Sequence, residues 1–217
     1  MIAVLVGCVA AIAVVGVGTA PDAGDAAIDT TAHAKSDFLH RWERWRRAPL
    51  RYTETTERRS GADHLAATVA VVQRFPDRIV HDGTDVSARV DGRQIGCSSS
   101  RDNPVSCVDN GAFDAEAQLR DELDEYSDLT DGPSATYRLT DRGDGCFRLR
   151  HLVTEFRPRW GDRTDICFDA ATGAVVSETL TTGALTITTT RVVGTKPVGP
   201  ADFVLPATPV ASPARGS

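Results

Sequence analysis

The sequence predicts an α+β fold built on one antiparallel sheet. Residues 145–194 alternate apolar and polar side chains in short runs, the period of strands with one buried face. Turn-forming residues, such as those at 169–173, separate the runs. Two helical segments interrupt the strands without the regular strand–helix alternation of a parallel sheet. The predicted order is a helix, a group of strands, a second helix and a second group of strands.

The second group of strands shows the clearest pattern. Phe147, Leu149 and Val153 alternate with polar residues, and Ile166 and Phe168 repeat this spacing. Further runs pass through Val176 and Leu180 and through residues 185–192, which are rich in β-branched side chains.

Cys146 and Cys167 lie one position out of phase with the apolar residues of their runs. If the two strands pair as a hairpin, both sulfur atoms leave the face opposite Phe147 and Phe168. We therefore expect a disulfide on the solvent-facing side, with two free thiols as the alternative.

Four cysteines fall in the part of the chain predicted to be exported, which favours disulfides over metal ligation. We expect Cys97 to pair with Cys107, and Cys146 with Cys167, one of three possible pairings. Each bridge is expected to contribute roughly 2–3 kcal/mol. No zinc-type spacing is present, and we expect neither a metal nor a cofactor.

Residues 2–20 are apolar or small and carry no charge. At about 1.5 Å per residue they span roughly 28 Å, close to a bilayer's hydrocarbon core. We expect a cleaved signal peptide or an N-terminal membrane anchor, and both place the remainder outside the cytoplasm. Cys8 ends a lipobox-like stretch, but apolar residues continue beyond it, so acylation is not expected.

The chain of 217 residues is long enough for one core, with a start and an end to spare. The expected divisions are a flexible tether at 21–35, one domain at 36–206 and a disordered tail at 207–217. The net charge of −6 argues against broad nucleic-acid binding. Five scattered histidines and the absence of a nucleophile or phosphate-loop motif argue against an enzyme.

The first helix is predicted from Ser36 to the residues before Pro49. Its aromatic stripe, Phe38, Trp42 and Trp45, is expected to pack on the sheet, with membrane-surface contact as the alternative. A second helix is predicted at 113–126, with a solvated acidic face. The first strands are predicted at 51–55, 65–74, 79–80, 86–90 and 93–96, followed by a polar loop at 98–106.

Short motifs resemble the LolA/LppX-type lipoprotein-carrier superfamily over residues 36–206. They are the aromatic first helix, the bend at Pro76-Asp77-Arg78, the turn at Asp169-x-x-Thr172-Gly173 and the closing Phe203-x-Leu205-Pro206. The resemblance implies a strongly curved antiparallel sheet, an incomplete β-barrel, with helices on its concave side and acyl chains held between them. The implied cavity-wall residues are Val69, Val71, Phe147, Leu149, Ile166, Phe168, Leu185 and Ile187, with Trp42 and Trp45 on the helical plug.

The chain departs from this family in three respects. The acylated cysteine common among actinobacterial members is not convincingly present, the carriers' strand arginine has no recognisable position, and cysteine-linked strands are foreign to the pattern. We therefore expect a non-catalytic envelope protein that binds a lipid or acyl chain, rather than lipoprotein sorting as such. The alternative is a sensor that contacts a membrane-anchored signalling partner through the basic side of its first helix and residues Thr186–Thr190.

Overall fold

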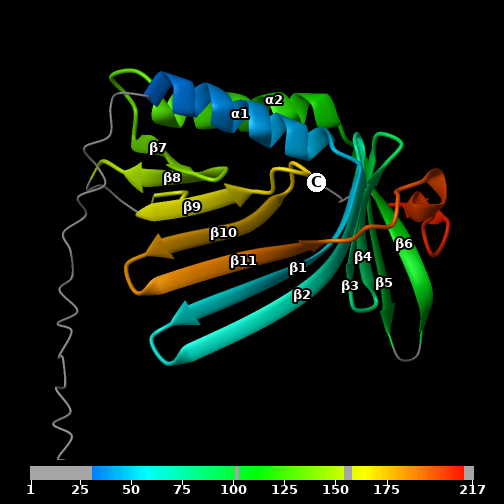
Figure 1. The fold of residues 1–217 in the computed structure, drawn as a ribbon. Helices are drawn as coiled ribbons and strands as arrows, with labels where there is room; N and C mark the ends of the chain where they lie inside the picture. The colour runs from blue at the N-terminus through cyan, green and yellow to red at the C-terminus, as the bar shows by residue number, and fades with distance from the viewer. Residues whose placement is uncertain (1–30, 101–102, 154–157, 213–217) are drawn as a thin grey trace, which may run out of the picture.

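The computed structural model describes residues 31–100, 103–153 and 158–212. In this part of the chain twelve strands form one curved sheet, which does not close into a barrel, and two helices lie side by side on its concave face (Figure 1). All neighbouring strands are antiparallel except β12 and β6. The predicted α+β class and the curved sheet are confirmed.

The helices are α1 (Thr31–Arg47) and α2 (Ala115–Thr130), and a short 3₁₀ helix, η1, covers Pro200–Phe203. The strand order across the sheet is β12-β6-β5-β4-β3-β2-β1-β11-β10-β9-β8-β7. The strands are β1 (Leu50–Ser60), β2 (Asp63–Arg74), β3 (Asp77–Asp82), β4 (Asp85–Val90), β5 (Arg93–Ser100), β6 (Asn103–Ala112), β7 (Tyr137–Gly143), β8 (Cys146–His151), β9 (Arg163–Phe168), β10 (Val175–Thr182), β11 (Leu185–Val193) and β12 (Pro209–Ala211).

The larger core lies between the helices and the concave face, called the inner face below. Phe38 of α1 is 1% exposed and packs edge to face on Tyr126 of α2 and on Phe147 of β8, with ring centroids 5.0 and 5.4 Å apart. Such aromatic pairs add to the free energy gained by burial. The predicted packing of the aromatic stripe on the sheet is confirmed.

A second core lies on the other face of the sheet, called the outer face. Val71 belongs to the first core and the next residue, Val72, to the second. Neighbouring strand residues point to opposite faces, so the outer face of β2–β6 needs its own cover. Phe203 of η1 supplies it, 8% exposed, with Leu205 packed beside it. In Figure 1 this C-terminal segment lies beside β3–β6, away from the helices.

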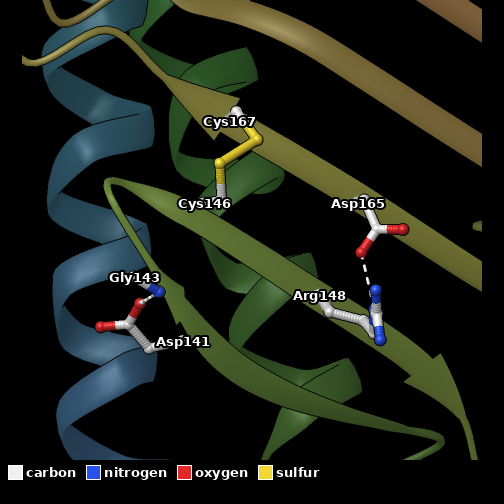
Figure 2. The surroundings of a disulfide bond; sticks show 6 residues. All are labelled: Asp141, Gly143, Cys146, Arg148, Asp165 and Cys167. Atoms are coloured by element: carbon white, nitrogen blue, oxygen red, sulfur yellow. Dashed lines mark hydrogen bonds and ion pairs between the residues drawn. A yellow bond between two sulfur atoms is a disulfide. The ribbon is translucent and has the colours of Figure 1, made fainter. Parts of the chain in front are cut away.

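Both expected cysteine pairs are disulfides. Cys146 and Cys167 lie directly opposite each other on β8 and β9, with Cα atoms 4.0 Å apart (Figure 2). Their side chains lie on the outer face, opposite Phe147 and Phe168, as predicted. Cys97 and Cys107 are instead buried, at 4% and 1% exposure, within the second core.

The structure corrects two predicted boundaries near the N-terminal half. α1 begins at Thr31 rather than Ser36, because Ala34 is buried and Lys35 forms an ion pair with Asp131 after α2. Within the predicted loop 98–106, residues 98–100 instead belong to β5 and residues 103–106 to β6, with Ser98 opposite Ser106. The disulfide next to this pair holds the two strands in register.

Two further corrections concern later segments. Val153 lies beyond the end of β8 and is 41% exposed, because pairing with β7 stops at His151. Residues 209–211, predicted within a disordered tail, form β12 on the edge of β6, where they satisfy backbone groups that an edge strand leaves unpaired.

Neither helix in the described ranges combines the length and hydropathy needed to span a bilayer. The apolar segment 2–20 lies outside the described residues.

Replacing Cys146 and Cys167 by alanine is expected to lower the free energy of unfolding by about 3 kcal/mol, because the bridge closes a loop in the unfolded chain. Replacing Cys97 and Cys107 is expected to cost more, since it also removes two buried side chains from the second core. Urea unfolding without reductant measures both. An equal loss for the two pairs would contradict the different placement of the sulfur atoms.

Candidate functional site

The end of α1 is fixed to the inner face by a buried glutamine. Gln73 of β2 is 2% exposed, and its side-chain nitrogen donates to the carbonyl oxygens of Trp45 and Ala48, at 2.7 and 3.2 Å. Its oxygen accepts from the Tyr52 hydroxyl at 3.4 Å. These bonds give two carbonyl groups at the end of α1 a buried donor, and the Trp45 carbonyl also accepts the Ala48 N–H at 3.3 Å. They hold the end of the helix against the sheet.

The charged faces of the two helices are directed largely at each other. Arg46 binds Glu122 through two hydrogen bonds of 2.9 and 3.1 Å, and Arg47 binds Glu116 through two of 2.9 Å. Trp42 also donates its indole N–H to Glu122. The acidic face of α2 is therefore only partly solvated, contrary to the sequence prediction. Much of the basic side of α1 is paired with it rather than free for a partner.

Most of the predicted cavity-wall residues lie in the packed core under the helices. The other three, Val69 on β2 and Leu185 and Ile187 on β11, are half-buried. The seven buried residues are 7% exposed or less: Trp42, Trp45, Val71, Phe147, Leu149, Ile166 and Phe168.

The inner face continues beyond the helices onto the free ends of two hairpins, β1–β2 and β10–β11. We call this region the open patch. Register places its side chains on the same face as Tyr52 and Val71, and Leu65 is 65% exposed. Apolar residues on β2, β10 and β11 flank two polar residues of β1. The open patch consists of Leu65, Ala67, Val69, Leu180, Leu185 and Ile187, with Thr56 and Arg58 between them.

A charged cluster lies where the open patch meets the core. Arg191 of β11 has an 8% exposed side chain, and its Nε donates to Glu54 of β1 at 2.7 Å. Its Nη2 lies 3.7 Å from Glu178 of β10, and its guanidinium lies over the Trp45 ring, 5.2 Å from the centroid. Guanidinium over an indole face is a favourable cation–π arrangement. The cluster therefore joins three strands to the end of α1.

Several buried donors near this junction have no hydrogen-bond partner within the described part of the chain. They are the indole N–H groups of Trp45 and Trp160, the Tyr126 hydroxyl and Nη1 of Arg191. Tyr126 stacks on Trp160 at 4.8 Å. Because a buried unpaired donor costs free energy, the junction favours hydrogen-bond acceptors.

Glu178 is the titrating group of the cluster. Burial raises the pKa of its carboxyl, while the nearby Arg191 opposes that rise. A raised pKa means that the folded state prefers the protonated carboxyl. Ionised Glu178 therefore lowers stability above its unfolded pKa, and this cost disappears as the pH falls through the raised value.

The predicted Thr186–Thr190 stretch places alternate residues on the outer face. There Thr186, Thr188 and Thr190 line a shallow cleft of about 440 Å³ with Glu57 and Arg59 of β1. None of the predicted cavity-wall residues lines this cleft.

Sequence reasoning missed Glu54, Glu178 and Arg191. The available signal was phase: Glu54 follows Tyr52 at the strand period, and Arg191 follows Ile187 in the same way. Charged residues in phase with an apolar face are expected to be paired when buried.

Replacing Arg191 by methionine is expected to lower the free energy of unfolding by about 3 kcal/mol near neutral pH, because two part-buried carboxylates lose their cation. The loss should shrink as the pH falls through the raised pKa of Glu178, because a protonated carboxyl no longer needs the cation. Arg58→Met, exposed on the same face of β1, is the matched control. A loss independent of pH would mean that Arg191 contributes packing and not charge.

No protein-family model and no curated protein matches the chain. Among solved structures it matches MucB in complex with MucA(peri), at 17% identity and a TM-score of 0.43, over 79% of this chain and 59% of that one. The Pseudomonas aeruginosa MucA/MucB complex matches at 17% identity and a TM-score of 0.41, over 79% and 60%. A LolA superfamily protein from Nitrosomonas europaea matches at 5% identity and a TM-score of 0.36, over 79% and 97%.

The chain thus spans less than two thirds of the length of the MucB chains it matches. At these identities and TM-scores no function is carried over. The open, curved antiparallel sheet with a helix pair on its concave face is the LolA-like architecture that the sequence resemblance implied.

Proposed function

We propose that this protein is a non-catalytic, extracytoplasmic protein that binds an acyl chain, or another apolar ligand, on the open patch. The observation that carries the proposal is the partial cover of the inner face. The helices bury the β7–β9 side, while Leu65 remains 65% exposed and Leu185 and Ile187 half-buried on the hairpins.

The open patch has the size and composition for part of a lipid. From Leu65 to Val69 it extends about 13 Å along β2, and four adjacent strands span about 14 Å. Each methylene moved there from water gains about 0.8 kcal/mol. Arg58 among the apolar side chains suits an amphiphile with an acidic head. The seven buried wall residues become available only if the helices move away.

The chemistry of the cysteines supports the proposed extracytoplasmic compartment. Two disulfides favour an oxidising environment. We propose that residues 2–20 deliver the domain there, as a signal peptide or as an anchor to the outer face of the cytoplasmic membrane.

One observation supports binding of an envelope protein instead. The space below the helices is occupied by packed aromatic rings, with Trp42 only 4.8 Å from Trp45 and 4.9 Å from Tyr126. A protein whose core is filled in this way offers a surface rather than a cavity. An apolar segment of a partner suits the same two hairpins.

Native mass spectrometry of the full chain, purified from its host membranes in mild detergent, tests the proposal. The wild type is expected to carry a bound lipid mass. Leu65→Asp and Leu185→Asp should each lose it, because a carboxylate on the patch opposes apolar burial. Val192→Asp places the same charge on the outer face of β11, at a residue that is 72% exposed, and should keep the ligand.

A wild type free of lipid, with a co-purifying envelope protein that Leu65→Asp abolishes, would replace lipid binding by partner binding. Retention of lipid in both patch variants would place the ligand elsewhere on the molecule.

A further inference from the structure

A small cleft lies at the opposite end of β2 from the open patch, beside the bend at residues 75–78. The start of α2 and the end of α1 close it from above. Its volume is about 20 Å³, room for about one water-sized group. The cleft therefore admits one end of a polar molecule and not a whole ligand.

Three arginines, Arg46, Arg78 and Arg89, line this cleft. Arg46 is neutralised by its two hydrogen bonds to Glu122. Within the described ranges, the one side-chain hydrogen-bond acceptor of Arg89 is the neutral Gln118, at 2.7 Å. Nε of Arg78 is buried and has no hydrogen-bond partner among the residues the structure describes.

Of the described residues that line the cleft, Asp77 is the only acid, and its Oδ1 accepts the backbone N–H of Asp91 at 3.1 Å. With Glu122 paired to Arg46, three guanidinium groups face two carboxylates. Burial lowers the pKa of Arg89, and the positive charges of Arg78 and Arg46 lower it further. The groups around the cleft thus repel one another and carry an excess of positive charge.

An aromatic ring holds one of the cleft's guanidinium groups in place. Arg89 lies over the Phe113 ring, with Cζ 4.4 Å from the centroid. A stacked guanidinium group loses less conformational entropy when it binds an oxyanion. The donors of Arg89 are therefore arranged before any ligand arrives.

We propose that this cleft binds a phosphate group, either free or as part of a lipid head group. Phosphate matches the unused donors of Arg78 and Arg89, which form charge-assisted bonds with its oxygen atoms. One or two of those oxygens enter the cleft while the rest of the molecule stays outside. The site is separate from the open patch, so the failure of one proposal leaves the other standing.

Gln118→Glu gives the sharpest test, because it only replaces the side-chain amide nitrogen by oxygen. The resulting carboxylate lies against Arg89 and takes the place of the bound anion. Thr68→Glu, exposed in the middle of β2, adds a carboxylate away from the cleft. The melting temperature of the full chain in detergent is measured against inorganic phosphate, with chloride at matched ionic strength. Wild type and Thr68→Glu are expected to gain stability saturably with phosphate. Gln118→Glu is expected to be stabler in chloride and to lose the response.

Calorimetric titration then separates the two sources. Inorganic phosphate and dihexanoyl phosphatidic acid, below its micelle concentration, are compared on the wild type. If phosphatidic acid binds at least about tenfold more tightly than inorganic phosphate, the site is assigned to a lipid head group. If the two bind equally, it is assigned to free phosphate. A phosphate response that is absent from the wild type, or unchanged in Gln118→Glu, overturns the proposal.

Discussion

The contact between the end of α1 and the inner face is the one on which the rest of the structure depends. Gln73, itself buried, binds the last carbonyl groups of the helix and the Tyr52 hydroxyl. Trp45 is thereby held over Arg191. The helix pair lies over one part of the sheet, and the free ends of the two hairpins extend beyond it (Figure 1). The packed core lies under the helices, and the open patch is the part of the inner face that they leave uncovered.

Two groups of charged side chains near the end of α1 differ in how their arginines are balanced. Beside the patch, Arg191 is balanced by Glu54 and Glu178, and the cluster ties three strands together. At the bend after β2, Arg78 and Arg89 lack carboxylate partners in the described part of the chain. Buried cations that are paired contribute to the fold, whereas unpaired ones cost stability. This contrast distinguishes a structural cluster from a site that suits an anion.

Much of the fold could be predicted because local patterns decide it. The alternation around Phe147 correctly predicted which residues of β8 face the core. The out-of-phase position of Cys146 correctly predicted the face on which its disulfide lies. What escaped prediction depends on neighbours distant in sequence. Val71 and Val72 are both apolar, so their sequence does not tell which face each core occupies. β12 forms only because β6 offers an unpaired edge.

The incomplete cover of the inner face can be measured directly by the rate of maleimide labelling. Leu65→Cys and Val71→Cys, each in a Cys8→Ser background, place a thiol on the same face of β2. Leu65 is 65% exposed and Val71 is fully buried. We predict rapid labelling at position 65 and labelling at position 71 only after denaturation. Equal rates at the two positions would contradict a helix pair that covers one end of the strand and leaves the other open.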